Sequence, residues 1–188
     1  ITAIEGLLSG SLAWLLSQQL ASEPFSERVR QARQDGITEP DPRIDLSGED
    51  VRRKLLILVR SLGVALEHAQ VQVRSLVPPA LAHCPSQALD AALWQLDAPM
   101  LAARQAAPGH TLAMVARWSA GQASVALEAL PPGHRLLGGV GTDNRVLLSS
   151  ERYQAQPLCI QGPGAGAALT AAALLDDVID VYRQGRWQ

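Results

Sequence analysis

"HTLAMVARWSAGQASVALEAL", residues 110–130, is the stretch in which the chain changes from helical to strand-like patterning. Two apolar runs flank Ala120-Gly121-Gln122, and a glycine between two such runs is typical of a β-hairpin. The stretch therefore predicts two antiparallel strands, and it opens the sheet-forming half of the sequence.

Downstream of the hairpin, two more short strands and a final helix are predicted. The strands are "RVLLSS", residues 145–150, and "AQPLCIQG", residues 155–162. The closing stretch "AGAALTAAALLDDVIDVYRQG", residues 165–185, is rich in alanine and has the periodicity of a helix.

Upstream of the hairpin, residues 1–63 are predicted to be helical apart from one loop. Apolar residues at helical spacing open this part of the chain, at Leu12, Leu15, Leu16 and Leu20. The prolines of "TEPDPRIDLS", residues 38–47, exclude helix and predict an extended loop. After the next helix, "AQVQVRSLV", residues 69–77, alternates as a strand does, and residues 87–106 predict another helix.

Helices followed by strands and a last helix predict an α+β fold, with a mixed, largely antiparallel sheet covered by helices on one face. The 188 residues suit one domain, and the net charge of −2 without a basic stripe argues against a nucleic-acid partner. The most apolar early run is interrupted at Gln18 and Gln19 and is too short for a membrane span. Cys84 and Cys159 fit no disulfide or metal spacing, so we expect reduced thiols in a cytoplasmic protein.

Lys54 is the only lysine among the 16 basic residues of the chain. It follows Asp50 by four positions on the helix predicted to start at Gly48, so the two side chains share one side of that helix. One interpretation is a surface ion pair that stabilises the helix by about 0.3–0.5 kcal/mol. The other is a functional lysine, because lysine can lose its proton whereas arginine effectively cannot.

Two further predictions concern the same helix. Ser47 and Asp50 have the spacing of a capping box. A core-facing stripe is predicted from apolar residues at helical spacing, namely Val51, Leu55, Leu58 and Leu62.

The loop before this helix supplies the carboxylates of Glu39, Asp41 and Asp45. It is either a solvated acidic turn or a site for a small cationic group that faces Lys54. No histidine lies nearby and the spacing is not that of an EF-hand, so no metal site is predicted.

The stretch "QGPGAGAALT", residues 161–170, places three glycines between a strand and a helix. It is either a tight turn or a place where the backbone approaches a ligand beside the free N–H groups of a helix N-terminus. It is not the dinucleotide fingerprint, because neither the glycine spacing nor a following acidic residue matches.

Three stretches of this chain resemble the catalytic region of homoserine dehydrogenase, in the order and at the spacing of that family. They are "GLLSGSLAWLL" (6–16), "FSERVRQARQDGITEPDPRIDLSGEDVRRKLLILVRSLG" (25–63) and "PLCIQGPGAGAALTAA" (157–172). The resemblance extends over nearly the whole chain and is weakest from residue 78 to residue 105. The residues of the chain are most similar to those of the bifunctional aspartate kinase–homoserine dehydrogenases, particularly the methionine-branch type.

The resemblance implies the reduction of L-aspartate 4-semialdehyde to L-homoserine with NADPH or NADH, in threonine and methionine synthesis, by a homodimer. Lys54 matches the catalytic lysine of the family, and Asp50 matches its carboxylate partner. Glu39 and Asp45, together with Thr38, match the positions that hold the amino end of the substrate.

The resemblance also implies a cofactor-binding segment near the nicotinamide. Its residues in this chain are Gly162, Gly164, Ala165 and Gly166.

Two departures from the family pattern stand out. The usual Gly-Thr-x-Asn is Gly10-Ser11-Leu12-Ala13 here, and the upstream dinucleotide-binding domain, with its second lysine, is absent. Residues 1–188 are therefore predicted to be the catalytic, substrate-binding and dimerisation domain of a longer enzyme, with its own upstream nucleotide-binding domain as partner. The alternative is a non-catalytic dimerisation or regulatory module derived from that domain.

Overall fold

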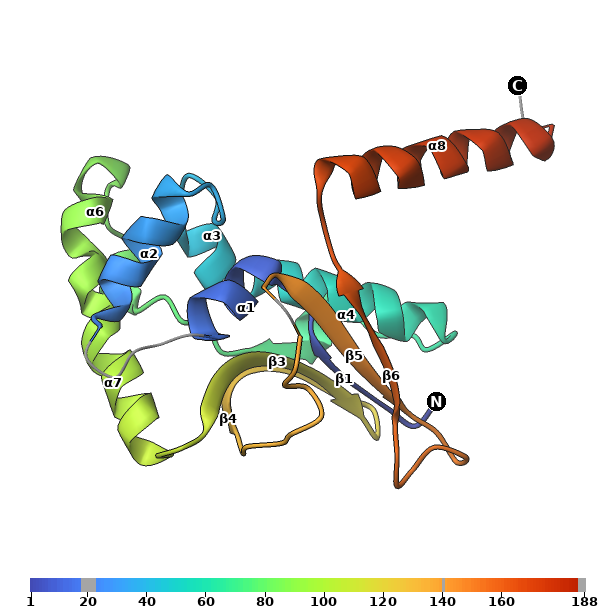
Figure 1. The fold of residues 1–188 in the computed structure, drawn as a ribbon, viewed down its shortest axis with the longest axis horizontal. Helices are drawn as coiled ribbons and strands as arrows, with labels where there is room; N and C mark the ends of the chain where they lie inside the picture. Colours follow the sequence, from blue (N-terminus) through green and yellow to red (C-terminus); the bar gives the residue numbers. More distant parts are fainter. Residues whose placement is uncertain (18–22, 140, 186–188) are drawn as a thin grey trace.

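A six-stranded sheet with helices on one face organises the computed structural model, which describes residues 1–17, 23–139 and 141–185 (Figure 1). The strand order is β2-β4-β3-β1-β5-β6, and all neighbours are antiparallel except the parallel pair β2 and β4. The strands are β1 (Ala3–Leu7), β2 (Val71–Val73), β3 (Thr111–Ser119), β4 (Gln122–Leu130), β5 (Asp143–Ser149) and β6 (Leu158–Pro163). The predicted α+β class and the mixed, largely antiparallel sheet are confirmed.

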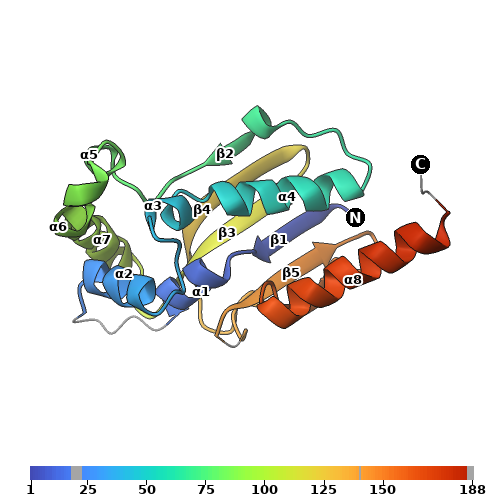
Figure 2. The same cartoon turned by 90° about the horizontal axis from the view of Figure 1, so that it is seen from above.

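The helices divide into two that lie over the sheet, a group beyond one end of it, and one that leaves the fold. Figure 2 shows α4 lying along the strands and α1 at the end of β1, with α2, α5, α6 and α7 beyond that end of the sheet. The α-helices are α1 (Gly10–Ser17), α2 (Phe25–Gln34), α3 (Arg43–Leu46), α4 (Glu49–Ser61), α5 (Pro79–Ala82), α6 (Leu89–Ala92), α7 (Asp97–Ala106) and α8 (Ala167–Arg183). Short 3-10 turns lie at His68–Gln70, Ser86–Ala88 and Leu93–Leu96.

Strand β3 is buried on both faces because its alternating side chains enter two separate apolar clusters. Leu112, Met114 and Ala116 belong to the main cluster, which β3 shares with the helices. Ala113 and Val115 point to the other face and join a smaller cluster with Leu130, Leu136 and Leu147. The segment 131–139 covers part of that second face.

The predicted hairpin of β3 and β4 is confirmed, and the geometry of its turn explains why residue 121 is a glycine. Ser119 pairs with Gln122, and the two residues between them, Ala120 and Gly121, have positive φ angles of 49° and 78°. Two consecutive residues with positive φ are characteristic of the type I′ turn, whose twist matches that of the flanking strands.

The first residues of the chain form a strand, so the prediction that residues 1–63 are helical outside the loop is wrong there. Strand β1 lies between β3 and β5, with Ala3 opposite both Ser119 and Ser149. Ile4 is buried beneath the helices. The strand is held by partners more than 100 residues away, which the local pattern does not reveal.

Helix α4 begins differently from the prediction. Its N-cap is Gly48, with a φ angle of 78°, and no side chain caps the helix, so the predicted capping box of Ser47 and Asp50 does not form. Ser47 instead donates a hydrogen bond to the carbonyl oxygen of Ile44 and accepts one from the amide of Glu49.

The buried stripe of α4 is also rotated from the prediction. It consists of Val51, Leu55, Leu56 and Val59, whereas Leu62 lies after the last turn and is 40% exposed. Apolar residues occupy every position from 55 to 59, so sequence periodicity alone leaves the rotation of the helix uncertain by one residue.

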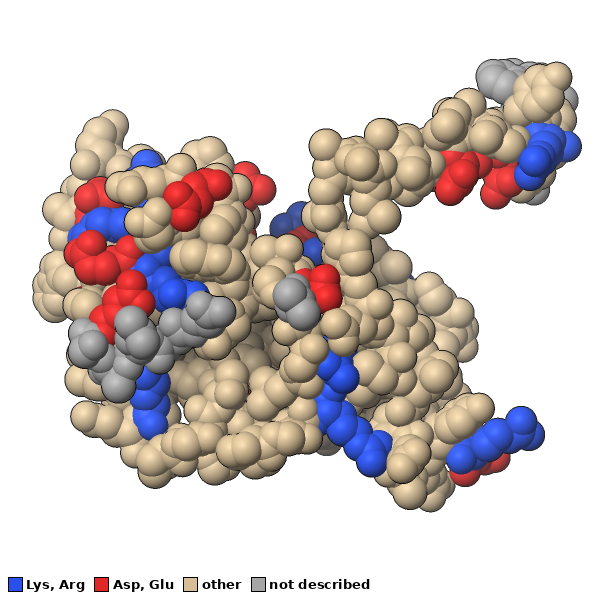
Figure 3. All heavy atoms as spheres, in the orientation of Figure 1, with Lys and Arg blue, Asp and Glu red and all other residues tan. Residues whose placement is uncertain are grey.

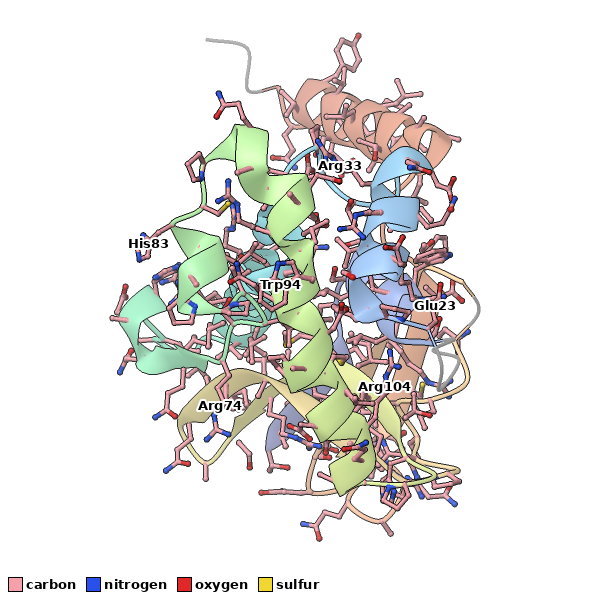
Figure 4. The ribbon with its side chains drawn as sticks, turned by 90° about the vertical axis from the view of Figure 1, so that its left-hand side faces the viewer. Glu23, Arg33, Arg74, His83, Trp94 and Arg104 are labelled. Carbon is pink, nitrogen blue, oxygen red and sulfur yellow. The ribbon has the colours of Figure 1, made fainter. Side chains whose placement is uncertain are left out.

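The remaining segments follow the predictions with small changes. The prediction that prolines exclude helix from residues 38–47 is wrong for α3, because Pro42 precedes the first helical residue and leaves the following turn free to form. The helix predicted over 87–106 is divided into α6, a 3-10 turn and α7. Figure 4 views this segment from outside, with Trp94 exposed on its outer face. The predicted strands after residue 140 and the closing helix are confirmed, whereas Leu20 lies outside the described residues.

Candidate functional site

A cleft of about 470 Å³ lies where the N-termini of three helices meet, those of α1, α4 and α8. It is lined by Ser9, Gly10, Ser11, Gly36, Ile37, Glu39, Asp50, Lys54, Thr142, Asn144, Gly164, Ala165 and Gly166. Six of the nine site residues predicted from the sequence are among these: Lys54, Asp50, Glu39, Gly164, Ala165 and Gly166. Helix N-termini carry partial positive charge, so their convergence favours a negatively charged group in this space.

Lys54 is held at the edge of the cleft by two acceptors. Its Nζ lies 2.8 Å from Oδ2 of Asp50, one helical turn earlier, and donates a 2.9 Å hydrogen bond to the carbonyl oxygen of Leu8. An ammonium group has three donors, so a third remains for a ligand. The side chain of Lys54 is 36% exposed, which leaves the ammonium accessible from the cleft.

The acidic loop contributes Glu39 to the lining, whereas Asp45 and Thr38 lie behind it. Oδ1 of Asp45 accepts a 2.6 Å hydrogen bond from Oγ of Ser11, and its Oδ2 accepts one of 2.9 Å from the amide of Glu39. Thr38 is buried, and its hydroxyl has no partner among the described residues. The carboxylate of Glu39 makes no hydrogen bond or ion pair with the part of the chain described, and the residue is exposed.

Arg43 fixes the far side of the same loop. Its guanidinium bonds the Asp41 carboxylate, with Nη2 and Oδ2 2.6 Å apart, and donates a 2.7 Å hydrogen bond to the carbonyl oxygen of Cys84. The hydrogen bond from Arg43 is the main reason that the pKa of Asp41 is lowered from its ordinary value. The two prolines and this pair hold the loop against the segment after α5.

The glycine segment enters the cleft at the start of α8. Gly166 is the N-cap of α8 and has a φ angle of 145°, which favours glycine. A Cβ at Gly164 would lie only 2.0 Å from Nδ2 of Asn144, so the Asn144 side chain lies closer to the backbone of residue 164 than any side chain there permits. Gly162, which pairs with Asn144 in the sheet, does not line the cleft.

Sequence reasoning did not find several residues of the cleft. Ser9, Thr142 and Asn144 were not predicted, and Ser11 was noted only as a departure from the family pattern. Oδ1 of Asn144 is buried without a hydrogen-bond partner among the described residues. Asn144 gave no local signal beyond its place directly before the predicted "RVLLSS" strand.

A second hollow, of about 240 Å³, lies between α1 and residues 136–143. It is more enclosed, and none of the nine site residues predicted from the sequence lines it. We therefore place the candidate chemistry in the cleft around Lys54. Within the described residues no cluster of three His, Cys, Asp or Glu side chains is arranged to hold a metal ion, and no helix is long and apolar enough to cross a membrane.

The chain matches a known protein family. The family model described as homoserine dehydrogenase matches residues 1–179. That range includes the cleft and all nine predicted site residues.

Two curated relatives are longer than this chain. The bifunctional aspartokinase/homoserine dehydrogenase 2 of Escherichia coli strain K12 is 45% identical over 184 residues, which is 95% of this chain and 22% of that protein. The homoserine dehydrogenase of Schizosaccharomyces pombe is 36% identical over 202 residues, and the match covers 99% of this chain and 52% of that protein. The chain thus spans about a fifth of the bifunctional relative and about half of the single-function one.

Solved structures share the fold. A crystal structure of a Candida auris protein of unknown function has a TM-score of 0.88 and 33% identity, covering 97% of this chain and 54% of that chain. The putative homoserine dehydrogenase of Archaeoglobus fulgidus has a TM-score of 0.69 at 24% identity, covering 97% of this chain and 51% of that one. The second likeness bears on the fold alone.

Proposed function

This chain belongs to the homoserine dehydrogenase family, and we propose that it is the substrate-binding and catalytic part of an enzyme that reduces L-aspartate 4-semialdehyde to L-homoserine with NADPH or NADH. One observation carries the proposal: the Lys54 ammonium, held by Asp50 and the Leu8 carbonyl, stands at the edge of a cleft. The family match over residues 1–179 and this arrangement favour the catalytic role over that of a non-catalytic dimerisation or regulatory module.

Lys54 is suited to stabilise and protonate the product oxygen. When bound, the nicotinamide supplies a hydride to the aldehyde carbon, and the carbonyl oxygen becomes an alkoxide. A positioned cation stabilises that charge, and an ammonium group can also donate the proton that completes the alcohol. Asp50 and the Leu8 carbonyl keep the ammonium in place, and the positive ends of three helices add to the stabilisation of the oxyanion.

Glu39 is suited to hold the amino end of the substrate. Its carboxylate lines the cleft that Lys54 also borders, and no partner within the described chain competes for it. An ammonium group pairs favourably with such a carboxylate, and the pairing orients the aldehyde at the other end of the substrate toward Lys54.

The segment 164–166 fits the approach of a flat nicotinamide ring. Its two glycines present backbone to the cleft beside Lys54. No other atom lies within 4 Å of the position that a Cβ on Gly166 would take. The sequence contains no G-x-G-x-x-G for the pyrophosphate. We therefore propose that most contacts to NADPH or NADH come from an upstream nucleotide-binding domain of the longer protein.

The uncovered apolar surface of α8 supports such a partner domain. The helix extends from the end of β6 away from the sheet, and the side chains of its first half are uncharged (Figures 1 and 3). Exposed large apolar residues on it are Leu169, Leu174, Leu175, Val178, Ile179, Val181 and Tyr182. On β6, Leu158 and Ile160 are also exposed. An isolated helix of this length is marginal in water, and an apolar surface of this extent marks an interaction site.

We expect the full-length protein to reduce L-aspartate 4-semialdehyde with NADPH or NADH, and residues 1–188 alone to show no turnover and little nucleotide affinity. The isolated domain keeps the Lys54 cleft but lacks the pyrophosphate and adenosine contacts. Steady-state loss of NADPH absorbance and calorimetric titration of the isolated domain check this. A full-length protein without this activity contradicts the proposed function, whereas turnover by residues 1–188 contradicts only the shared site.

We also propose that this domain forms a homodimer through the sheet face opposite α1 and α4. Segment 131–139 covers that face only in part, and the cluster beneath it is small. Light scattering of the isolated domain at micromolar concentration should give about 40 kDa, twice the 20.0 kDa of the chain. A mass near that of the single chain contradicts the proposal. A cytoplasmic location and the methionine-branch subtype stay predictions.

A further inference from the structure

Asp45 connects two walls of the cleft without lining it. It lies on α3, and its carboxylate accepts one hydrogen bond on each oxygen: from Oγ of Ser11 at 2.6 Å and from the amide of Glu39 at 2.9 Å. Ser11 and Glu39 both line the cleft, on α1 and on the acidic loop. The Asp45 carboxylate thus joins the acidic loop to Ser11, which lies 34 positions before Asp45 in the sequence.

The wall that Asp45 holds through Ser11 also carries an acceptor for Lys54. Ser11 shares a 3.0 Å hydrogen bond with the hydroxyl of Ser9, and the Ser9 hydroxyl accepts the amide of Leu12 at 3.3 Å, which caps α1. The carbonyl of Leu8, one residue earlier, accepts the hydrogen bond from Nζ of Lys54. Segment 8–11 therefore joins the Asp45 carboxylate to the Lys54 ammonium.

The carboxylate free to meet a substrate ammonium is that of Glu39. It lines the cleft with no partner in the described part of the chain, whereas Asp45 does not line the cleft and each of its oxygens already accepts a hydrogen bond inside the protein. Hydrogen bonds to an ionised carboxylate are short and about twice as strong as neutral ones, which suits Asp45 to a positioning role.

We propose that Asp45 is a positioning residue for the reaction, which holds Glu39 and segment 8–11 in place and does not itself contact the amino group of the substrate. This rests on the proposed function and revises the role that the resemblance implies for Asp45. Because Asp45 acts on the segment that holds Lys54, its loss affects the chemistry as well as the binding of the amino end.

The test compares two substrates in the full-length enzyme, in the direction of alcohol oxidation: L-homoserine, and 4-hydroxybutanoate, which lacks the amino group. We expect Asp45→Asn to lower kcat/KM by about 10- to 100-fold for both substrates, with a fall in kcat. Glu39→Gln should lower kcat/KM for homoserine and leave that for 4-hydroxybutanoate nearly unchanged. If the defect of Asp45→Asn disappears with 4-hydroxybutanoate, as for Glu39→Gln, Asp45 contacts the amino group and the proposal is wrong.

Ser11 gives a second route to the same question that does not depend on the Asp45 variant folding. Ser11→Thr keeps the hydroxyl for Asp45 and should retain most activity, whereas Ser11→Ala should reproduce part of the Asp45→Asn defect. The two defects should add incompletely in the double variant, since both change the same contact between residues 11 and 45. Fully additive defects contradict the proposal. A wild-type enzyme that fails to oxidise homoserine contradicts the proposed function instead, whatever the variants do.

Asp35→Asn serves as the control for lost negative charge. Asp35 is exposed at the end of α2, before the acidic loop, and its carboxylate accepts only the Gln31 amide within the described residues. It should leave both substrates unaffected. A defect equal to that of Asp45→Asn would show that net charge, and not the hydrogen bonds of Asp45, is responsible.

Discussion

Lys54→Arg in the full-length enzyme should lower kcat by about 10²- to 10⁴-fold, the usual contribution of a positioned acid. Arginine keeps the charge but has no readily transferable proton, and its planar fork does not fit where Nζ bonds both Asp50 and the Leu8 carbonyl. Lys54→Met, which loses the charge as well, should be as slow or slower. Steady-state kinetics of both variants check the prediction.

Two controls separate this effect from a structural one. Arg53→Lys changes an exposed cation on the same helix and should be silent in kcat. The melting temperature of Lys54→Arg should barely change, since an exposed ion pair contributes at most about 1 kcal/mol. A Lys54→Arg variant with wild-type kcat would reduce Lys54 to a surface partner of Asp50.

Gly164→Ala should lower kcat/KM by about 10²-fold, the loss expected when reacting groups are misplaced by about 1 Å. The new Cβ would lie 2.0 Å from Nδ2, 2.5 Å from Cγ and 2.9 Å from Oδ1 of Asn144, so the whole amide or the segment 164–166 has to move. Because Oδ1 of Asn144 is buried, the amide has little room to turn away. Kinetics with varied NADPH and with varied aldehyde show for which of the two kcat/KM falls.

The chain offers a matched control and a rescue for Gly164→Ala. A Cβ at Gly162 meets no atom within 4 Å and the backbone there is not left-handed, so Gly162→Ala should keep wild-type kinetics. Asn144→Ala removes the atoms that clash, and the double variant should recover relative to Gly164→Ala, measured against Asn144→Ala alone. No recovery, with Asn144→Ala itself active, would show that the close approach is not the cause.

Local signals in the sequence were enough for the second half of the fold. Gly121 marked the hairpin, since the turn needs positive φ there, and the alanine-rich end of the chain was recognised as α8. Strand β1 was missed because its five residues continue into the apolar α1 and because its partners lie in β3 and β5. Five residues carry too little periodicity to outweigh that continuation.

The prediction of the start of α4 failed for a similar reason. Ser47 satisfies the local rule for a cap, but Gly48 packs against the sheet, where an added Cβ would meet Val73 at 3.2 Å and Val125 at 3.4 Å. Those contacts come from β2 and β4, so a rule limited to four neighbouring residues cannot include them. The left-handed glycine is therefore a requirement of tertiary packing.

The contacts of the candidate site also fall into two groups, those that the sequence spacing predicts and those that it does not. Lys54 and Asp50 are four residues apart on one helix, and their 2.8 Å contact follows from that spacing. The acceptor from Leu8 lies 46 residues away, and Asn144 comes from β5, the strand next to the edge strand β6. Such partners depend on the topology, which a single sequence specifies but does not display.

The central place of β1 has a consequence for the order in which the sheet is assembled. Ala3 pairs with Ser119 and with Ser149, so the middle of the sheet is complete only after synthesis has passed Ser149. Contacts between such distant residues carry a large loop-closure entropy and slow the search for the native pairing. Until then the chain has helices with no sheet to cover, and the apolar faces of α1 and α4 are the surfaces that a chaperone would have to shield.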